Sequence, residues 1–442
     1  MKNILNTFSL ECNRQTKINF EGGDLSSDAG LLMLKEFAEK IGFVDLLKKH
    51  FKTKDPSTFR IHGDVDNLLQ VIYSCIAAYH EDDCADELTL DPIFTSILEK
   101  DALASQPTLS RFFNRMDEDV IKQLETITQE SRQNAYRIER PEHLLIDIDS
   151  SLLPTFGEQE GEAFNYHYQA HGYHPLFAFD GITGDLLKAE LREGTHYCSR
   201  DAHKFVEPLL LEFEQDYYDI PVYLRGDSGF ASPDLYEMCE EHNCKYAIRL
   251  KQNKSLMKNI QLEDAAFTLA CNRDIISHKV TYGEFIYQAG SWKVPRRVVY
   301  KIEKPYGQCH HLYTFIVTNM EMDPYQVIQF YCGRGRMENF IKEGKSGFDF
   351  AATSSHSMVV NACRFLIRCL AYNLFNWFRR LVLPKSMCKQ RIDTIRLKLL
   401  KIAARVVKGA RYITFKLCSS CPYKDEFYET FENIRRLQLQ IE

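Results

Sequence analysis

The 442-residue sequence lacks the features of a secreted or membrane-spanning protein. Its first residues, MKNILNTFSLECNRQTK, contain no apolar core of about 7–15 residues before a small-residue cleavage site, so we expect no secretion. The most apolar stretch, residues 365–383, is interrupted by Arg368, Arg379 and Arg380. That charge is too high for a membrane span and favours a buried amphipathic helix. We therefore predict a cytoplasmic protein without membrane association.

The 14 cysteines lack the spacing of a disulfide framework or of a complete zinc site. Cys418 and Cys421 have ligand-like spacing, but no second pair lies nearby to complete a tetrahedron. Cys239 and Cys244 flank His242, again without a fourth ligand. Reduced thiols in a cytoplasmic protein are the favoured interpretation.

The chain also lacks an overall excess of positive charge, since its formal net charge is −6. The charge is nevertheless unevenly distributed. Residues 331–442 contain 21 Lys and Arg against 9 Asp and Glu, which gives 21 − 9 = +12, so residues 1–330 carry −6 − 12 = −18. This asymmetry favours a basic C-terminal surface that faces a polyanion, although a solvated helical face would give the same pattern.

Hydrophobic periodicity, with no internal repeats or low-complexity tracts, predicts an α/β protein with flanking helical regions. Residues 1–140 have the pattern of a small helical bundle, for which DNA binding or dimerisation is expected. Residues 141–251 alternate apolar strands with amphipathic helices, as in a mixed sheet. Residues 252–320 predict a β-rich insertion. Residues 321–355 predict one helix opened by Asp323 and a proline, and residues 356–442 a basic, all-helical end.

Carboxylates interrupt two of the predicted core strands. In LLIDIDSS, Asp147 and Asp149 are two positions apart, so on a strand both side chains project from the same face. In YLRGDSGF, Asp227 follows another apolar strand. Charges on apolar strands are costly unless a cation or a donor meets them. Capping of the following turn is the alternative role for each aspartate, but the same arrangement on two strands favours a site at the strand ends.

The segment YCGRGRMENFIKEGK, residues 331–345, concentrates charge on one helical face. With Tyr331 at 0°, Arg334, Glu338 and Lys345 fall near 300°, 340° and 320° at about 100° per residue. One face thus presents a carboxylate framed by two cations and a phenol. A surface ion-pair ladder is the simpler alternative, but Glu338 and Lys342 already supply that at i,i+4 spacing.

Together these residues predict a phosphoryl-transfer site. Asp149, Asp227 and Glu338 are suited to hold two Mg²⁺ ions, or Mn²⁺ in their place, with Asp147 as a further candidate ligand. Two such ions stabilise the attacking and leaving oxygens of an in-line displacement at phosphorus. Arg334 and Lys345 would contact flanking phosphates.

At this point the chain resembles a known family. The pattern Y-x2-R-x3-E-x6-K, formed here by Tyr331, Arg334, Glu338 and Lys345, is similar to the signature of bacterial insertion-sequence DDE transposases. The stretches QPTLSRF, FNYHYQAHGYHPLFAFDG and YLRGDSGF resemble one subgroup of that family. The resemblance extends over nearly the whole chain.

The resemblance implies a ribonuclease H-like catalytic fold with a β-rich insertion before the glutamate helix. It selects Asp149, which precedes Ser residues, over Asp147 as the first catalytic aspartate, with Asp227 second and Glu338 third. It implies that Tyr331, Arg334 and Lys345 contact phosphates at the element's end. The implied activity is cleavage at terminal inverted repeats and joining of the 3′-OH to target DNA, by a homodimer in the DNA complex that is nucleoid-associated when bound.

Weaker expectations concern the rest of the DNA interface. Arg336 and Lys342, on the same helix as Glu338, would add phosphate contacts. Trp292 is a candidate to stack on an unpaired base, although packing in its own sheet is the simpler expectation. Three histidines, at positions 167, 171 and 174, either line the site or pack in a hairpin. A metal-dependent nuclease without strand transfer and a domesticated DNA-binding protein are the alternative functions.

Overall fold

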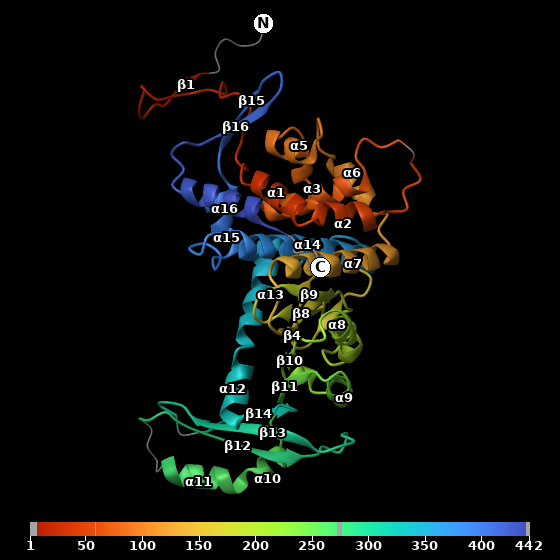
Figure 1. The fold of residues 1–442 in the computed structure, drawn as a ribbon, viewed down its shortest axis with the longest axis vertical. Coiled ribbons are helices and arrows are strands. Elements are labelled where there is room, and N and C mark those ends of the chain that lie inside the picture. Colours follow the sequence, from red (N-terminus) through yellow and green to blue (C-terminus); the bar gives the residue numbers. More distant parts are fainter. Residues whose placement is uncertain (1–6, 58, 272–275, 309, 439–442) are drawn as a thin grey trace. The chain divides into compact units, whose positions relative to one another are not determined.

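The computed structural model describes residues 7–57, 59–271, 276–308 and 310–438 (Figure 1). Its contacts divide the chain into two compact units. The helical unit contains residues 1–138, 347–349 and 370–442. The sheet unit contains residues 139–346 and 350–369. Both units are therefore assembled from segments far apart in the sequence.

The sheet unit is built on an eight-stranded mixed sheet with the order β12-β13-β14-β11-β10-β4-β8-β9. Its strands, in chain order, are β4 (Leu144–Ser150), β8 (Leu176–Asp180), β9 (Leu186–Glu190), β10 (Val222–Gly226), β11 (Lys245–Leu250), β12 (Lys279–Tyr287), β13 (Arg296–Lys304) and β14 (Leu312–Thr318). The central strands β4, β10 and β11 are parallel, whereas the outer strands pair antiparallel. The first five residues of β4 and all of β8 are buried, which explains their nearly continuous apolar sequences.

Helices and a small second sheet complete the sheet unit. The helices are α8 (Ala202–Asp216), α9 (Pro233–Glu241), α10 (Lys254–Asn259), α11 (Gln261–Cys271), α12 (Pro324–Cys332) and α13 (Gly335–Phe348), with a 3₁₀ turn at Ser228–Phe230. The small sheet has the order β5-β7-β6, from Leu153–Pro154, Ala170–Tyr173 and Ala163–Asn165. The expected β-rich insertion is thus preceded by two helices. Its three strands extend the main sheet beside β11 rather than forming a separate layer.

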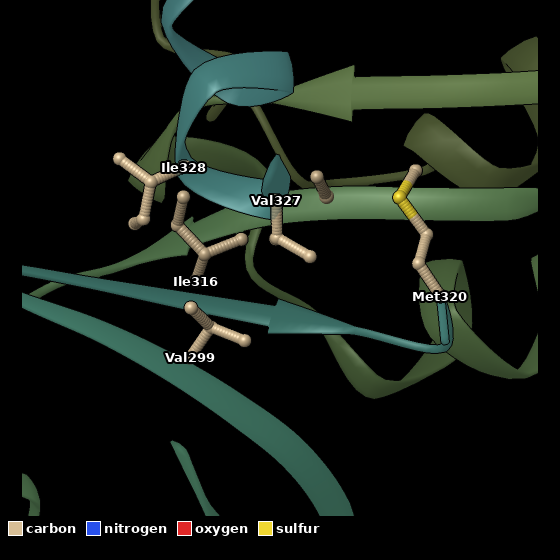
Figure 2. Packing of buried hydrophobic residues seen from close by; sticks show 6 residues of the cluster. Val299, Ile316, Met320, Val327 and Ile328 are labelled. Atoms are coloured by element: carbon tan, nitrogen blue, oxygen red, sulfur yellow. The ribbon is translucent and has the colours of Figure 1, made fainter. Parts of the chain in front are cut away.

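Helix α12 is anchored on this extension. Asp323 caps it by accepting a hydrogen bond from the Gln326 backbone N–H, as the Asp-Pro start predicts. Figure 2 shows Val327 and Ile328 of α12 packed against Val299 of β13 and Ile316 of β14. This apolar cluster fixes the helix that leads to Glu338, and Tyr331 packs at its border.

The helical unit contains seven helices in its N-terminal part. They are α1 (Leu31–Lys40), α2 (Phe43–His50), α3 (Asp64–Ile76), α4 (Cys84–Glu87), α5 (Pro92–Leu98), α6 (Gln106–Phe113) and α7 (Glu118–Ile138). Two short strands, β1 (Phe8–Ser9) and β2 (Lys17–Ile18), pair with each other. A third, β3 (Leu25–Ser26), pairs with a strand from the C-terminal region. The described N-terminal residues are therefore mainly, but not entirely, helical.

The prediction of an all-helical C-terminal region is wrong. Helix α14 (Met358–Leu381) is followed by α15 (Ile392–Ile395), which runs directly into a π-helical turn at Arg396–Leu400. The chain then forms a hairpin of β15 (Ala404–Lys408) and β16 (Ile413–Leu417) before α16 (Lys424–Arg436). The β-branched residues of ARVVK and ITF favour strands, and β15 gains a second partner in β3.

Helix α14 is the one described helix long and apolar enough to cross a membrane. However, 89% of its apolar window is buried inside the protein. That burial fits a core helix, as the arginines in this stretch indicated.

The single helix expected over residues 321–355 is also divided. Helix α12 ends at Cys332 and α13 starts at Gly335, with Gly333 in a helical backbone conformation between them. A Cβ at Gly333 would come within 2.6 Å of Nη1 of Arg225, so the close approach that this glycine permits is to the protein's own arginine. Tyr331 lies in the last turn of α12, Arg334 lies in the junction, and Glu338 lies in the first turn of α13.

Candidate active site

Two adjacent parallel strands present pairs of charged residues at matching heights. In the ladder between β4 and β10, Asp147 lies opposite Arg225. Asp149 follows Asp147 by two positions, and Asp227 follows Arg225 by two positions. In an extended backbone, side chains two positions apart project from the same face. Neighbouring strands are about 4.8 Å apart. An opposite-charge pair inside the sheet is thus followed by a like-charge pair at the strand ends.

The inner pair is fully enclosed. Nε and Nη2 of Arg225 donate to the two carboxylate oxygens of Asp147 at 2.6 and 2.7 Å. The Asp147 side chain is 0% exposed and that of Arg225 4%. Burial raises the pKa of the Asp147 carboxyl, and the hydrogen bonds and charge of Arg225 oppose that shift. Both oxygens of Asp147 thus accept hydrogen bonds from a buried arginine, which makes it part of a structural ion pair; its predicted role as a metal ligand stays a prediction.

Arg225 also connects the sheet to the helix junction. Its Nη1 donates to the backbone carbonyl of Phe330 at 2.6 Å, and its guanidinium lies over the Phe330 ring, 5.1 Å from the centroid. One buried side chain therefore binds β4 and the last turn of α12. Arg225 was not among the residues predicted from the sequence, although it stands in YLRGDSGF two positions before Asp227.

The outer pair is more open. Nη2 of Arg334 lies 3.0 Å from Oδ2 of Asp149 and donates to the carbonyl of Ile148 at 3.2 Å. The Asp149 side chain is 18% exposed. Burial raises the pKa of Asp149 to about 6; Arg334 opposes the shift, whereas the charges of Asp227 and Glu338 add to it. The charged form of Asp149 is therefore disfavoured by burial and by its acidic neighbours, and a further cation nearby would stabilise it.

Asp227 caps the 3₁₀ turn that follows β10. Its Oδ1 accepts a hydrogen bond from the Gly229 backbone N–H at 2.8 Å. Within the residues described, its other carboxylate oxygen has no hydrogen-bond partner. The capping role considered from the sequence is therefore real, but it occupies only one of the two oxygens, and the second remains available to a ligand.

Glu338 lies in the first turn of α13. Its side chain is 61% exposed, and its one ion pair with a described residue is the i,i+4 contact with Lys342 at 3.7 Å. A contact this exposed contributes little to stability. The carboxylate therefore faces solvent, near enough to Asp149 for its charge to raise the pKa of that residue.

The residues predicted to contact DNA have different environments. Tyr331 is half-buried, and its pKa is raised by burial and by the charges of Asp227 and Asp149, with Arg334 and Arg249 opposing. Lys345 donates to Ser151 Oγ and to the carbonyl of Leu152, each at 2.6 Å, so two of its three N–H groups hold the chain that follows β4. Burial lowers the pKa of Lys345. Arg336 and Lys342 are exposed.

Trp292 does not fit the predicted role of stacking on a base. Its side chain is 8% exposed. The ring packs edge-to-face with Tyr236 and Tyr287, and the guanidinium of Arg296 lies 5.7 Å from its centroid. Trp292 is a core residue of the sheet unit, as the simpler expectation had it.

A different aromatic residue, Tyr168, lies beside the outer aspartates. Burial raises its pKa to about 12, and the charges of Asp149, Cys198 and Asp227 contribute to the same shift. Its ring packs against His167 and His174, and across the described part of the chain its O–H makes no hydrogen bond. The histidines of this segment were predicted as candidates from the sequence, whereas Tyr168 between them was not.

The candidate donors for divalent ions are the carboxylates of Asp149, Asp227 and Glu338. Among the described residues, no three His, Cys, Asp or Glu side chains already lie close enough to enclose one ion. Mg²⁺ usually takes one or two protein carboxylates and completes its shell with water and phosphate. The like-charge pair of Asp149 and Asp227, with the exposed Glu338, fits that requirement in chemistry and in charge.

Comparison with known proteins gives a family and two distant structures. The family model described as Transposase DDE domain group 1 matches residues 8–439. The piggyBac transposase synaptic complex with hairpin DNA matches at 15% identity with a TM-score of 0.46, covering 85% of this chain and 79% of that chain. The Mos1 transposase paired-end complex with left transposon end matches at 13% identity and a TM-score of 0.17, covering 44% and 61%. No curated protein matches the sequence.

Proposed function

Because this chain belongs to the family described as Transposase DDE domain group 1, we propose that it is a DNA transposase of an insertion sequence. It binds the terminal inverted repeats of its element, cleaves at the element ends and joins each freed 3′-OH to target DNA. The observation that supports this chemistry is the like-charge pair of Asp149 and Asp227 at the ends of two parallel strands, with the charge of Glu338 acting on Asp149.

The proposed reaction has two phosphoryl transfers at one site. In the first, the oxygen of a water molecule attacks the phosphorus at the element end, and the bond from phosphorus to the 3′ oxygen of the element breaks. The departing oxygen takes a proton and becomes a 3′-OH. In the second, that hydroxyl attacks a target phosphodiester, which releases one target 3′-OH and forms one new phosphodiester bond.

Asp149, Asp227 and Glu338 are the residues that would hold two Mg²⁺ or Mn²⁺ ions. When bound, such ions stabilise the charge on the attacking and leaving oxygens. The surrounding residues position these carboxylates. Arg334 fixes Asp149 through Oδ2, and the Gly229 N–H fixes Asp227 through Oδ1. Lys345 holds the loop after β4, and its third N–H, which has no partner among the described residues, would reach a phosphate.

The strand order supports a ribonuclease H-like core as part of the proposal. Strands β4, β8 and β9 form an antiparallel meander, and β10 and β11 add parallel to β4 on its other side. Asp149 belongs to β4 and Asp227 directly follows the adjacent strand β10, which supports their assignment to one site. A bacterial element as the source, a homodimer in the DNA complex and a cytoplasmic, nucleoid-associated location stay predictions.

The test is a cleavage assay on duplex DNA taken from the borders of the gene's own element, with Mg²⁺. We expect Asp149→Asn, Asp227→Asn and Glu338→Gln each to abolish strand cleavage while leaving DNA binding intact. Asp234→Asn, which neutralises an exposed acid on α9 of the same unit, is the matched control and should cleave normally. Normal cleavage by Glu338→Gln would contradict the assignment.

Pre-cleaved ends separate the proposed function from its nuclease alternative. A transposase joins a pre-cleaved 3′-OH to a second duplex, whereas a nuclease without strand transfer yields no joined product. Absence of both cleavage and joining, with DNA binding retained, would instead support a domesticated DNA-binding protein.

A further inference from the structure

The β15–β16 hairpin of the helical unit, residues 404–417, carries positive charge without any negative charge. We call it the basic hairpin. It contains four cationic residues and no Asp or Glu. The four, all exposed, are Arg405, Lys408, Arg411 and Lys416. Across the described residues, none of them forms an ion pair or a side-chain hydrogen bond.

Two of these cations face each other directly. In the ladder between β15 and β16, Arg405 lies opposite Lys416. Side chains at opposite positions share a face of the hairpin, and like charges placed there are destabilising. The folded hairpin therefore accepts an electrostatic penalty that a bound polyanion would remove.

Lys401, which precedes the basic hairpin, is a cation with partners inside the protein. Nζ of Lys401 lies 2.6 Å from Oδ1 of Asp28 and 4.0 Å from the centroid of the Tyr79 ring. Asp28 is buried, so this lysine is held by the protein itself. The four cations of the basic hairpin, only a few residues further on, have no such partners.

Protection of an exposed sheet edge does not account for this pattern. Strand β16 is an edge of its sheet, in which the order is β16-β15-β3. Charged side chains on an edge discourage pairing with other chains. However, Arg405 lies on the central strand, and Arg411 lies in the turn. Positively and negatively charged side chains together would protect the edge equally well, and they would not place two cations opposite each other.

We propose that the basic hairpin binds the phosphate backbone of duplex DNA. This inference rests on the proposed function, because it assigns a surface of the helical unit to the same substrate. Its exposed Arg and Lys side chains are suited to contact backbone phosphates, and such contacts carry no sequence information. Tyr412, 76% exposed beside Arg411 in the turn, adds an amphipathic side chain to the same tip.

The test is the dependence of DNA affinity on salt, measured by fluorescence anisotropy with the full-length protein. Each lost phosphate contact lowers the slope of log Kobs against log[salt] by about 0.9 on B-DNA. For the triple variant Arg405→Gln, Arg411→Gln, Lys416→Gln we expect a slope smaller by about 2–3. The loss should be the same on an element-end duplex and on a scrambled duplex of equal length, because phosphate contacts do not read sequence.

The matched control neutralises three exposed cations of the sheet unit that lie outside the candidate site, as Lys251→Gln, Lys254→Gln, Lys258→Gln. It should keep the wild-type slope. An equal loss in this control would mean that net charge, and not the hairpin, determines binding. An unchanged slope in the hairpin variant would overturn the proposal. It would also be overturned if the triple variant lost salt-dependent binding to vesicles of anionic lipid but kept that to duplex DNA.

Lys416→Glu separates binding from folding. It creates an opposite-charge pair with Arg405, so the Tm should stay the same or rise while affinity for DNA falls. A fall in Tm of the same variant together with unchanged affinity would show that the cation is structural. If the wild type binds duplex DNA but does not cleave it, the proposed function fails and the hairpin inference stands; if it cleaves and the triple variant keeps its slope, only the inference fails.

Discussion

Two aspartates of one strand, two residues apart, have opposite fates in this fold. Asp147 is fully buried and uses both oxygens on Arg225. Asp149 is partly exposed, lies 3.0 Å from Arg334, accepts a hydrogen bond from the Ser150 backbone N–H, and faces the like charges of Asp227 and Glu338. An acidic doublet on one strand therefore places one aspartate in a buried bidentate ion pair and the next among other carboxylates at the strand end. Burial and the surrounding charges distinguish the two aspartates.

The largest difference should appear in catalysis. Asp149→Asn removes a carboxylate that would hold a metal ion, which is expected to cost several kcal/mol of transition-state stabilisation and so about 10³-fold or more in cleavage rate. A single-turnover cleavage assay measures it. Near-normal cleavage by this variant would remove the distinction between the two aspartates.

The next largest effect should be on stability, at the inner pair. Asp147→Asn leaves the Arg225 guanidinium buried without a counter-charge, and breaking a buried pair in this way costs about 3–5 kcal/mol. Urea unfolding, followed by a probe of the sheet unit, measures the free energy. The double variant Asp147→Leu, Arg225→Met should recover part of the loss, since it removes both charges; a double variant less stable than Asp147→Asn would argue against the ion pair as the cause.

The pH dependence should distinguish the aspartates with a smaller effect. The pKa of Asp149 is raised to about 6 from its ordinary value of 3.8, so the folded state holds this proton more tightly than the unfolded state. Stability is then lost as pH rises from about 4 to about 6, by an amount on the order of 1–2 kcal/mol after discounting for partial exposure. In metal-free buffer, the Tm of Asp149→Asn should therefore fall less than the Tm of the wild type as the pH rises from about 4 to about 6. Parallel Tm profiles would contradict the raised pKa.

The smallest effect concerns Tyr168, beside the outer pair. Loss of a phenol that donates to a charged phosphate oxygen costs about 1.5 kcal/mol or more, so Tyr168→Phe should slow cleavage about tenfold. Tyr166→Phe is the control, because that ring is 82% exposed and packs on Phe164 in the same turn. Equal rates for the two variants would leave Tyr168 without a role at the site.

The sequence predicted the strands that carry the aspartates and the helix start at Asp323, because apolar runs and an Asp-Pro cap are local signals. It also indicated a basic C-terminal surface. It could not separate Asp147 from Asp149 by pattern, since both lie on the same strand face and only the distant Arg225 distinguishes them. The β15–β16 hairpin was missed although its β-branched residues are a local strand signal, whereas the pairing of β15 with β3 joins segments about 380 residues apart and has no such signal. The burial of Trp292 likewise depends on Tyr236 and Arg296 from other elements.

Convergence of the three carboxylates can be measured directly by replacing Mg²⁺ with Fe²⁺ and adding ascorbate, so that hydroxyl radicals formed at the bound ion cut the nearby polypeptide. With element-end DNA present, the account predicts cuts within a few residues of Asp149, Asp227 and Glu338, all suppressed by excess Mg²⁺ and absent in Asp149→Asn. Cuts that omit any one of these three segments, or that persist in Asp149→Asn, would contradict it.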